Sequence, residues 1–194
     1  MTLFLAFLAG VAGTAAAVSI GARRLGFAGQ SPADYAAATR TFDLVRHLDG
    51  RMICEGVIFG PTGRVSSRFV ADVLVTWDGD SGRMSERFQY SSGETQLREW
   101  RLTILANGRI QAEADDLVGI GEGEVSGAGL RLTYRIRLPE GSGGHVLDAI
   151  DWMYLVDNGT IINRSQFRKY GIKLAELVAT IRPVEAADKA REAA

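Results

Sequence analysis

A strict alternation of apolar and polar residues runs through most of this chain, and it limits the folds that the chain can adopt. Between Leu130 and Leu138 every second side chain is apolar, and arginine or threonine occupies the positions between them. Successive side chains of a strand point to opposite faces of a sheet, so this pattern indicates a strand with one buried face. The same period of two recurs from residue 51 to residue 182 without a helix-length gap, which predicts an all-β domain.

Short turn sequences divide this region into strands. Asp78-Gly79-Asp80, Ser91-Ser92-Gly93 and Ala106-Asn107-Gly108 are typical of the tight turns that connect hairpins. Because a long meander with one apolar face must remove its edges, we predict an up-and-down antiparallel barrel over residues 50–182. The pattern of the last segment, residues 172–182, also fits a helix. The ten predicted strands are 50–59, 64–77, 82–90, 94–105, 109–116, 118–125, 129–138, 146–157, 160–168 and 172–182.

The N-terminal segment is apolar and uncharged. Residues 3–22 are close to the length of about 20 that a membrane-spanning helix needs. We therefore predict an N-terminal apolar helix in residues 1–24 that acts as a membrane anchor or signal segment. A single-span anchor is favoured over a cleaved signal because the basic start of a signal peptide is absent, and a buried helix is the third alternative. Arg23 and Arg24 favour a cytoplasmic location for the domain on their C-terminal side.

Residues 25–49 are predicted to form a linker with short helical turns. Ser31 and Pro32 have the pattern of an N-cap and a first helical position, which predicts a helix to Ala38. Thr41 and Asp43 are the candidate starts of a second turn that runs to residue 48. The C-terminal tail, residues 183–194, is predicted to be disordered or helical.

Composition excludes several classes of function. The 22 basic and 23 acidic residues give a net charge of -1, which argues against a nucleic-acid partner. One cysteine, Cys54, and two histidines cannot supply a recognisable metal site, and Cys54 is predicted to be a small buried hydrophobe. The chain has no phosphate-binding loop, dinucleotide fingerprint or nucleophile elbow. We therefore predict no metal, no cofactor and no enzymatic activity.

One hairpin places charges on its apolar face. A three-residue loop at Ser91-Ser92-Gly93 pairs Tyr90 with Glu94, and therefore Glu86 with Arg98. An inward charge is costly unless it is paired. Two interpretations are open: a buried ion pair that fixes the register, or a polar anchor at the floor of a ligand pocket.

A second hairpin gathers polar and aromatic residues around Asn158-Gly159. With a two-residue loop, Tyr154 would oppose Asn163, and Asp151 would lie diagonal to Arg164. One more loop residue would change these pairs. The cluster is either aromatic packing with a surface ion pair or part of a ligand site.

The two hairpins and neighbouring positions supply the candidate ligand-binding residues. An apolar barrel interior with one polar anchor suits an apolar ligand, and Arg98 is placed to meet a carboxylate head group. The candidates are Glu86, Arg98, Trp100, Phe88, Tyr90, Trp77, Arg68, Asp151, Trp152, Tyr154, Asn163 and Arg164.

Several short motifs resemble a bacterial family catalogued as domain of unknown function 3833. The resemblance covers about residues 32–183 and implies a lipocalin-like (calycin-type) barrel with no established activity. Many members of the family look like exported lipoproteins, but this chain lacks the lipobox cysteine. The motifs are Phe42-Asp43-Leu44, Gly63-Arg64-Val65, Arg68-Phe69, Trp77-Asp78-Gly79, Phe88 with Tyr90, Arg98-Glu99-Trp100-Arg101, Asp151-Trp152-Met153-Tyr154-Leu155, Ile162-Asn163-Arg164-Ser165 and Lys169-Tyr170-Gly171.

Three functions remain in competition. The favoured one is a membrane-tethered protein that binds a fatty acid or lipid, and the second is a structural or assembly protein of the envelope with a filled barrel. The third is a lipid-acting enzyme that uses Glu86 or Asp151 as acid or base. We expect a single-pass anchor in the bacterial inner membrane. The family resemblance favours a periplasmic domain, and Arg23-Arg24 favours a cytoplasmic one.

Overall fold

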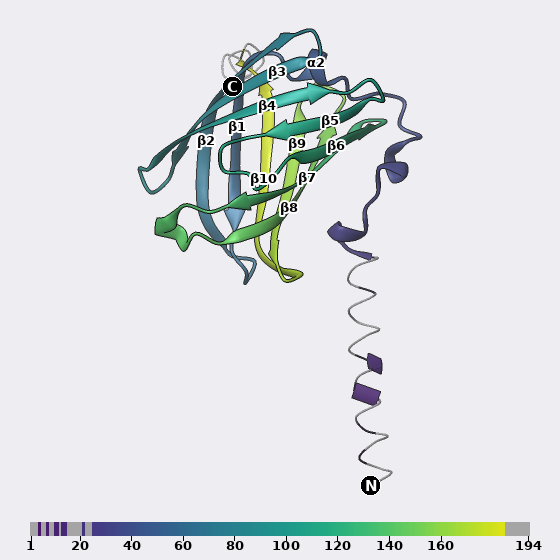
Figure 1. The fold of residues 1–194 in the computed structure, drawn as a ribbon, viewed down its shortest axis with the longest axis vertical. Coiled ribbons are helices and arrows are strands. Elements are labelled where there is room, and N and C mark those ends of the chain that lie inside the picture. Colours follow the sequence, from purple (N-terminus) through teal and green to yellow (C-terminus); the bar gives the residue numbers. More distant parts are fainter. Residues whose placement is uncertain are drawn as a thin grey trace.

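Ten antiparallel strands close into one barrel (Figure 1). The computed structural model describes residues 4, 7, 10, 11, 13, 14, 21 and 25–184. Each strand pairs with its neighbours in the chain, and the last pairs with the first, so the predicted meander barrel is confirmed. The strands are β1 (Gly50–Phe59), β2 (Val65–Asp78), β3 (Ser81–Tyr90), β4 (Thr95–Ile104), β5 (Arg109–Glu113), β6 (Gly121–Ser126), β7 (Gly129–Arg137), β8 (Val146–Leu155), β9 (Ile161–Lys169) and β10 (Ile172–Pro183).

The last predicted segment of the barrel forms the strand β10 and not the helix that its sequence also fits. It pairs with β9 and with β1, which closes the barrel. Gly56 makes this closure possible, because a Cβ atom there would lie 2.4 Å from the carbonyl oxygen of Val178. A larger residue at position 56 would force β1 and β10 apart.

The chain between β5 and β6 departs from the predicted strands. The prediction extended the fifth strand to residue 116 and began the sixth at residue 118. In the structure these residues turn toward β7 instead. The N–H of Val118 donates to the Arg135 carbonyl at 2.8 Å, and the N–H of Arg137 donates to the Asp116 carbonyl at 2.8 Å. This detour leaves β5 short and brings Asp116 close to the barrel interior.

One end of the barrel is covered by the short helix α2 (Leu44–His47). Its Leu44 and the following Leu48 are buried in the core, and the indole N–H of Trp77 donates to the Leu48 carbonyl at 2.7 Å. The N-cap of α2 is Asp43, whose Oδ1 accepts from the Arg46 N–H at 3.0 Å. We call this the α2 end of the barrel, and the turns β1–β2, β3–β4, β7–β8 and β9–β10 lie at the opposite end.

The barrel core is formed by alternate residues of the strands. On β2 the residues at 69, 71, 73 and 75 are buried and those between them are exposed, as the alternation predicts. Inward side chains of the other strands complete one continuous apolar cluster. Its largest fully buried members inside the barrel are Met52, Ile161 and Val75.

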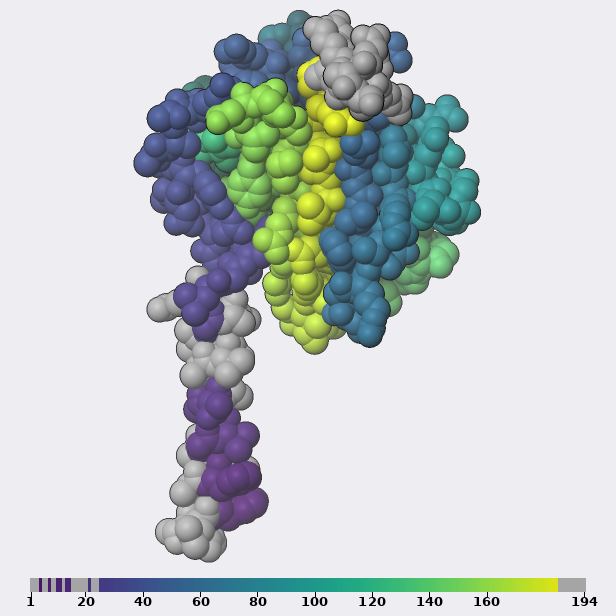
Figure 2. All heavy atoms as spheres, turned by 180° about the vertical axis from the view of Figure 1, so that it is seen from behind, coloured from purple at the N-terminus to yellow at the C-terminus, as the bar shows by residue number. Residues whose placement is uncertain are grey.

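The linker before α2 runs along the outside of the barrel wall. It contains two 3-10 helices, η1 (Phe27–Gly29) and η2 (Pro32–Tyr35), so the helix predicted to reach Ala38 is shorter and tighter than expected. The Ser31 N–H donates to Asp34 Oδ2 at 2.7 Å, which fixes the start of η2. Figure 2 shows this violet-blue segment lying against the green strands β8 and β9.

Aromatic residues hold the linker on the outer face of the wall. The Tyr35 ring lies 5.1 Å from the Trp152 ring and 5.4 Å from the Tyr154 ring. The Tyr154 hydroxyl donates to Gln30 Oε1 at 2.6 Å. Gly127 permits a close approach, because a Cβ atom there would lie 1.9 Å from the Tyr35 carbonyl oxygen.

The predicted apolar helix in residues 1–24 lies for the most part outside the described residues, and so does the tail from residue 185 onward. Among the residues that are described, no helix has both the length and the apolar character needed to cross a membrane.

Candidate functional site

A cavity of about 100 Å³ lies inside the barrel beneath the α2 end. Most of its wall is apolar, with Leu44 and Leu48 from the α2 end and with side chains from most of the strands. A set of polar side chains interrupts the apolar wall on five strands, and we call this set the polar belt. It consists of Glu86 on β3, Arg98 on β4, Tyr134 on β7, Asp151 on β8, and Asn163 and Ser165 on β9.

The predicted register of the first hairpin is confirmed. Tyr90 donates its N–H to the Glu94 carbonyl at 2.9 Å, and Glu86 lies directly opposite Arg98. Of the two interpretations of this pair, the direct ion pair is not formed, because Arg98 instead forms its salt bridge with Asp116 at 3.0 Å. The detour between β5 and β6 is the reason, since it brings the Asp116 carboxylate within reach of the guanidinium.

Arg98 and Glu86 are both held by Trp100. The guanidinium carbon of Arg98 lies 4.0 Å from the centre of the Trp100 ring, a cation–π contact. The indole N–H of Trp100 donates to Glu86 Oε2 at 3.1 Å. Burial raises the pKa of Glu86 to about 7, although Arg98 and the indole hydrogen bond lower it. Glu86 is therefore a group that titrates near neutral pH.

Asp151 is the most deeply enclosed acid of the belt, with 7% of its surface exposed. Its Oδ2 accepts from the Tyr134 hydroxyl at 2.9 Å. Its Oδ1 has no hydrogen-bond partner among the described residues. Burial raises the pKa of Asp151, although the hydrogen bond from Tyr134 and the charge of Arg98 lower it. A buried carboxylate oxygen without a donor is costly, so this atom is the least satisfied point of the belt.

The β9 side of the belt is neutral and internally bonded. The Asn163 side-chain amide donates to the Trp152 carbonyl at 3.2 Å, and the Ser165 hydroxyl donates to Asn163 Oδ1 at 3.3 Å. Cys54 also lines the cavity, and burial raises the pKa of its thiol to about 12. The thiol is therefore protonated at neutral pH and unreactive, in line with its prediction as a buried hydrophobe.

The register of the second hairpin differs from the prediction by one residue. Its loop has three residues, because the Val156 N–H donates to the Thr160 carbonyl and Gly159 adopts a left-handed φ of 83°. As a result Met153, not Tyr154, opposes Asn163. The added loop residue, Asp157, is the cause of the shift.

In this register, part of the predicted site lies on the outside of the barrel. Trp152 and Tyr154 alternate with inward Asp151, so they face the linker rather than the cavity. Arg164, which lies opposite Trp152, forms an outer salt bridge with Glu176 at 2.6 Å. The outward residues of this hairpin therefore fit the interpretation as aromatic packing with a surface ion pair, whereas Asp151 and Asn163 line the cavity.

The remaining candidates divide by position along their strands. Arg68 is on the exposed face of β2, opposite in direction to Phe69. Trp77 packs at the α2 end, and Tyr90 lies at the opposite end with its hydroxyl 2.9 Å from Gln96 Oε1. The candidates that do line the cavity are Glu86, Phe88, Arg98, Trp100, Asp151 and Asn163.

Three members of the arrangement were not among the candidates. Tyr134 and Ser165 lie on the inward face of their strands, so the alternation alone would have selected them. Asp116 could not be found in this way, because it lies outside regular strands and reaches Arg98 through an irregular segment.

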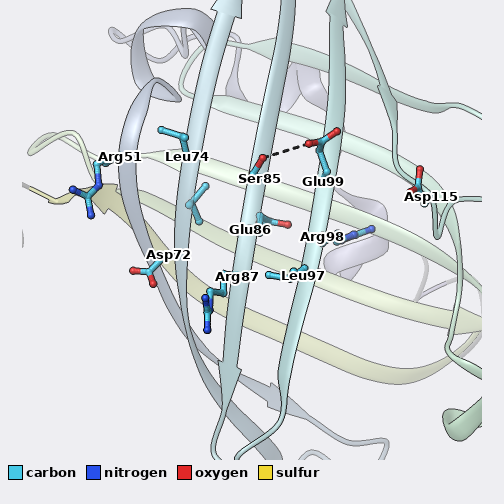
Figure 3. Close-up of a pocket in the computed structure, with 11 residues that line it drawn as sticks. Arg51, Asp72, Leu74, Ser85, Glu86, Arg87, Leu97, Arg98, Glu99 and Asp115 are labelled. Carbon is cyan, nitrogen blue, oxygen red and sulfur yellow. Dashed lines mark hydrogen bonds between the residues drawn. The ribbon is translucent and has the colours of Figure 1, made fainter.

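A wider hollow of about 580 Å³ lies on the outer side of β2, β3 and β4 (Figure 3). Its rim carries charges of both signs, among them the exposed Asp72 and Arg87 and the half-buried Glu99, and Ser85 hydrogen-bonds to Glu99. Glu86 and Arg98 belong to both linings because β3 and β4 form the wall between the two spaces. The inner cavity is the better candidate site, since it alone encloses buried polar atoms within an apolar wall.

Comparisons with known proteins identify the family. No curated protein matches the chain. A solved structure from Bacteroides fragilis with a YmcC-like fold is similar at 8% sequence identity and a TM-score of 0.36, over 68% of this chain and 94% of that chain. The model of a family described as protein of unknown function (DUF3833) matches residues 23–183, and the chain therefore belongs to this family.

Proposed function

We propose that this protein binds one slender amphipathic molecule inside a lipocalin-like barrel that is tethered to a bacterial membrane. The observation that carries the proposal is the enclosed cavity, whose apolar wall is interrupted by the polar belt and by the unpartnered Oδ1 of Asp151. Binding sites for small molecules have this character: mostly apolar walls with a few polar groups that fix orientation.

The size of the cavity restricts the ligand. Its 100 Å³ is smaller than the roughly 300–1,000 Å³ of a typical small-molecule site. Only a narrow group fits without movement of side chains. A longer apolar chain would extend toward the opposite end of the barrel, where the half-buried Phe88 and Phe167 line the cavity.

The tether is proposed from the sequence. Residues 3–22 are uncharged and mostly apolar and are followed by Arg23 and Arg24, which suits a single-span anchor in the inner membrane. A topology reporter fused to Ala194 of the full chain determines the side of the membrane. Activity of a periplasm-dependent reporter places the barrel in the periplasm, and activity of a cytoplasm-dependent reporter places it in the cytoplasm.

Native mass spectrometry of the full chain, purified in detergent, tests ligand binding. We expect one small molecule per chain. The variant Ser165→Leu, which fills the cavity from β9, should lose this molecule. The matched variant Arg164→Leu changes the next residue, on the outer face of the same strand, and should keep it. Absence of any bound molecule, together with no uptake of added amphiphiles, contradicts the proposal.

The small volume also favours a second function, a scaffold with a filled barrel. A space of 100 Å³ holds roughly three water molecules at their share of liquid volume. If the cavity holds only water, no small molecule should accompany the wild-type chain, and no amphiphile should bind when added.

A further inference from the structure

We infer that the polar belt selects a ligand whose polar end donates hydrogen bonds or carries positive charge. An amine should therefore bind more tightly than an alcohol, and an alcohol more tightly than a carboxylate. This inference rests on the proposed function, because it names the chemical class of ligand for the same cavity. It departs from the expectation of a fatty acid, which depended on Arg98 as a receptor for a carboxylate.

Arg98 is already neutralised. Its guanidinium lies 3.0 Å from Asp116 and is stacked on the Trp100 ring. The two partners of this salt bridge are largely buried, with 15% and 26% of their side-chain surfaces exposed. A ligand carboxylate would have to compete for the guanidinium with Asp116, which is fixed by the backbone hydrogen bond between its carbonyl and Arg137.

The neutral donors of the belt are also used within the protein. The Tyr134 hydroxyl donates to Asp151, and the Trp100 indole donates to Glu86. The Asn163 amide donates to the backbone of β8, and the Ser165 hydroxyl donates to Asn163. Of the fully buried polar atoms of the belt, the one left without a partner is an acceptor, Oδ1 of Asp151, so the complementary ligand group is a donor.

Charge favours the same class. Arg98 and Asp116 cancel, which leaves Glu86 and Asp151 as the acidic groups of the cavity that form no salt bridge of their own. A third carboxylate brought beside them would be repelled, whereas an ammonium group would balance them and form charge-assisted hydrogen bonds. A hydroxyl group donates without bringing charge, so an alcohol should rank between the two.

The ranking is measured with three probes of equal chain length: decylamine, decanol and decanoic acid. Each is titrated into the full chain in detergent at neutral pH, with tryptophan emission as the readout because Trp100 lines the cavity. We expect decylamine to bind about tenfold or more tightly than decanoic acid, with decanol between them. The ranking in the wild-type chain requires no variant and so does not depend on the folding of one.

A pair of variants locates the preference. Asp151→Asn removes one of the two carboxylates and the unpartnered acceptor, and should reduce the advantage of the amine over the alcohol, with Glu86 retaining part of it. Asp148→Asn removes a charge from the exposed face of the same strand and should leave the ranking unchanged, which controls for partition of the probes into detergent.

The outcomes separate this inference from the proposed function. Equal or tighter binding of decanoic acid, with Ser165→Leu abolishing it, overturns the inference and leaves ligand binding intact. Failure of all three probes to bind the wild-type chain, together with the absence of a co-purified molecule, overturns both.

Discussion

The hairpins β3–β4 and β8–β9 share several residue types and have different roles. Each carries a carboxylate, an arginine and aromatic residues close to a glycine turn. In β3–β4 the acid, the arginine and the indole point inward and line the cavity. In β8–β9 only Asp151, Asn163 and their inward neighbours do so, while Trp152 and Arg164 face outward.

The difference shows that one loop residue, together with the linker before α2, decides which residues face the cavity and which are buried on the outside of the barrel. The extra residue in the β8–β9 loop shifts the pairing by one, which exchanges the partners of every residue in the hairpin. The linker then covers the outward aromatics, so Trp152 has only 1% of its surface exposed although it does not face the cavity. Burial of an aromatic residue therefore does not by itself indicate a binding site in this barrel.

The largest effect on stability is expected for a substitution on the outer face of the barrel wall. Trp152→Ala should lower the free energy of unfolding by about 3–5 kcal/mol, because it removes a fully buried ring packed between Tyr35 and Tyr154. Ligand affinity should stay the same once the variant is folded. Chemical unfolding of the full chain in detergent measures the loss, and probe titration measures affinity. A loss below about 1 kcal/mol would show that the linker does not pack there.

The pH dependence of stability should come from the acidic residues that face the cavity, Glu86 above all. The pKa of Glu86 is raised by burial to about 7, so the folded chain binds a proton that the unfolded chain releases near pH 4.5. Stability should therefore fall as the pH rises from about 4.5 to 7, by about 3 kcal/mol at most, and level off above that range.

The variant Glu86→Gln isolates this contribution. Unfolding midpoints of the wild type should fall across that range of pH, and those of the variant should fall less. The raised pKa of Asp151 leaves a residual dependence with the same sign. Parallel curves for the two proteins would contradict the assignment to Glu86.

The same substitution on the two faces should have unequal effects. Tyr134→Phe removes a donor from the buried Asp151 and should cost about 1–3 kcal/mol, because a polar group is left unsatisfied. Tyr154→Phe removes a donor from Gln30 at the edge of the linker and should cost about 0.5–1.5 kcal/mol. Calorimetry of both variants in detergent compares them, and a reversed order would contradict the division into an inner and an outer face.

The barrel was predictable because its information is local. Alternation defines each strand, and glycine turns define the hairpins, so ten antiparallel strands can be derived without any knowledge of distant contacts. The pairing of Glu86 with Arg98 depended on one loop length, and that length was correct.

The site was only partly predictable, because its remaining parts depend on nonlocal contacts. Asp116 reaches Arg98 by an irregular path that pairs with β7, and no periodic signal marks it. The burial of Trp152 depends on Tyr35, which is far away in the sequence. The direction of Arg68, by contrast, was given by alternation, so its place among the candidates was avoidable.

One measurement tests most directly whether the inner face is the binding site: the change in tryptophan emission when decylamine is added to two variants of the full chain. Trp100 lines the cavity, and Trp152 lies under the linker. We predict that Trp152→Phe keeps the emission change of the wild type and that Trp100→Phe loses it. An emission change that persists in Trp100→Phe and disappears in Trp152→Phe would contradict binding inside the barrel.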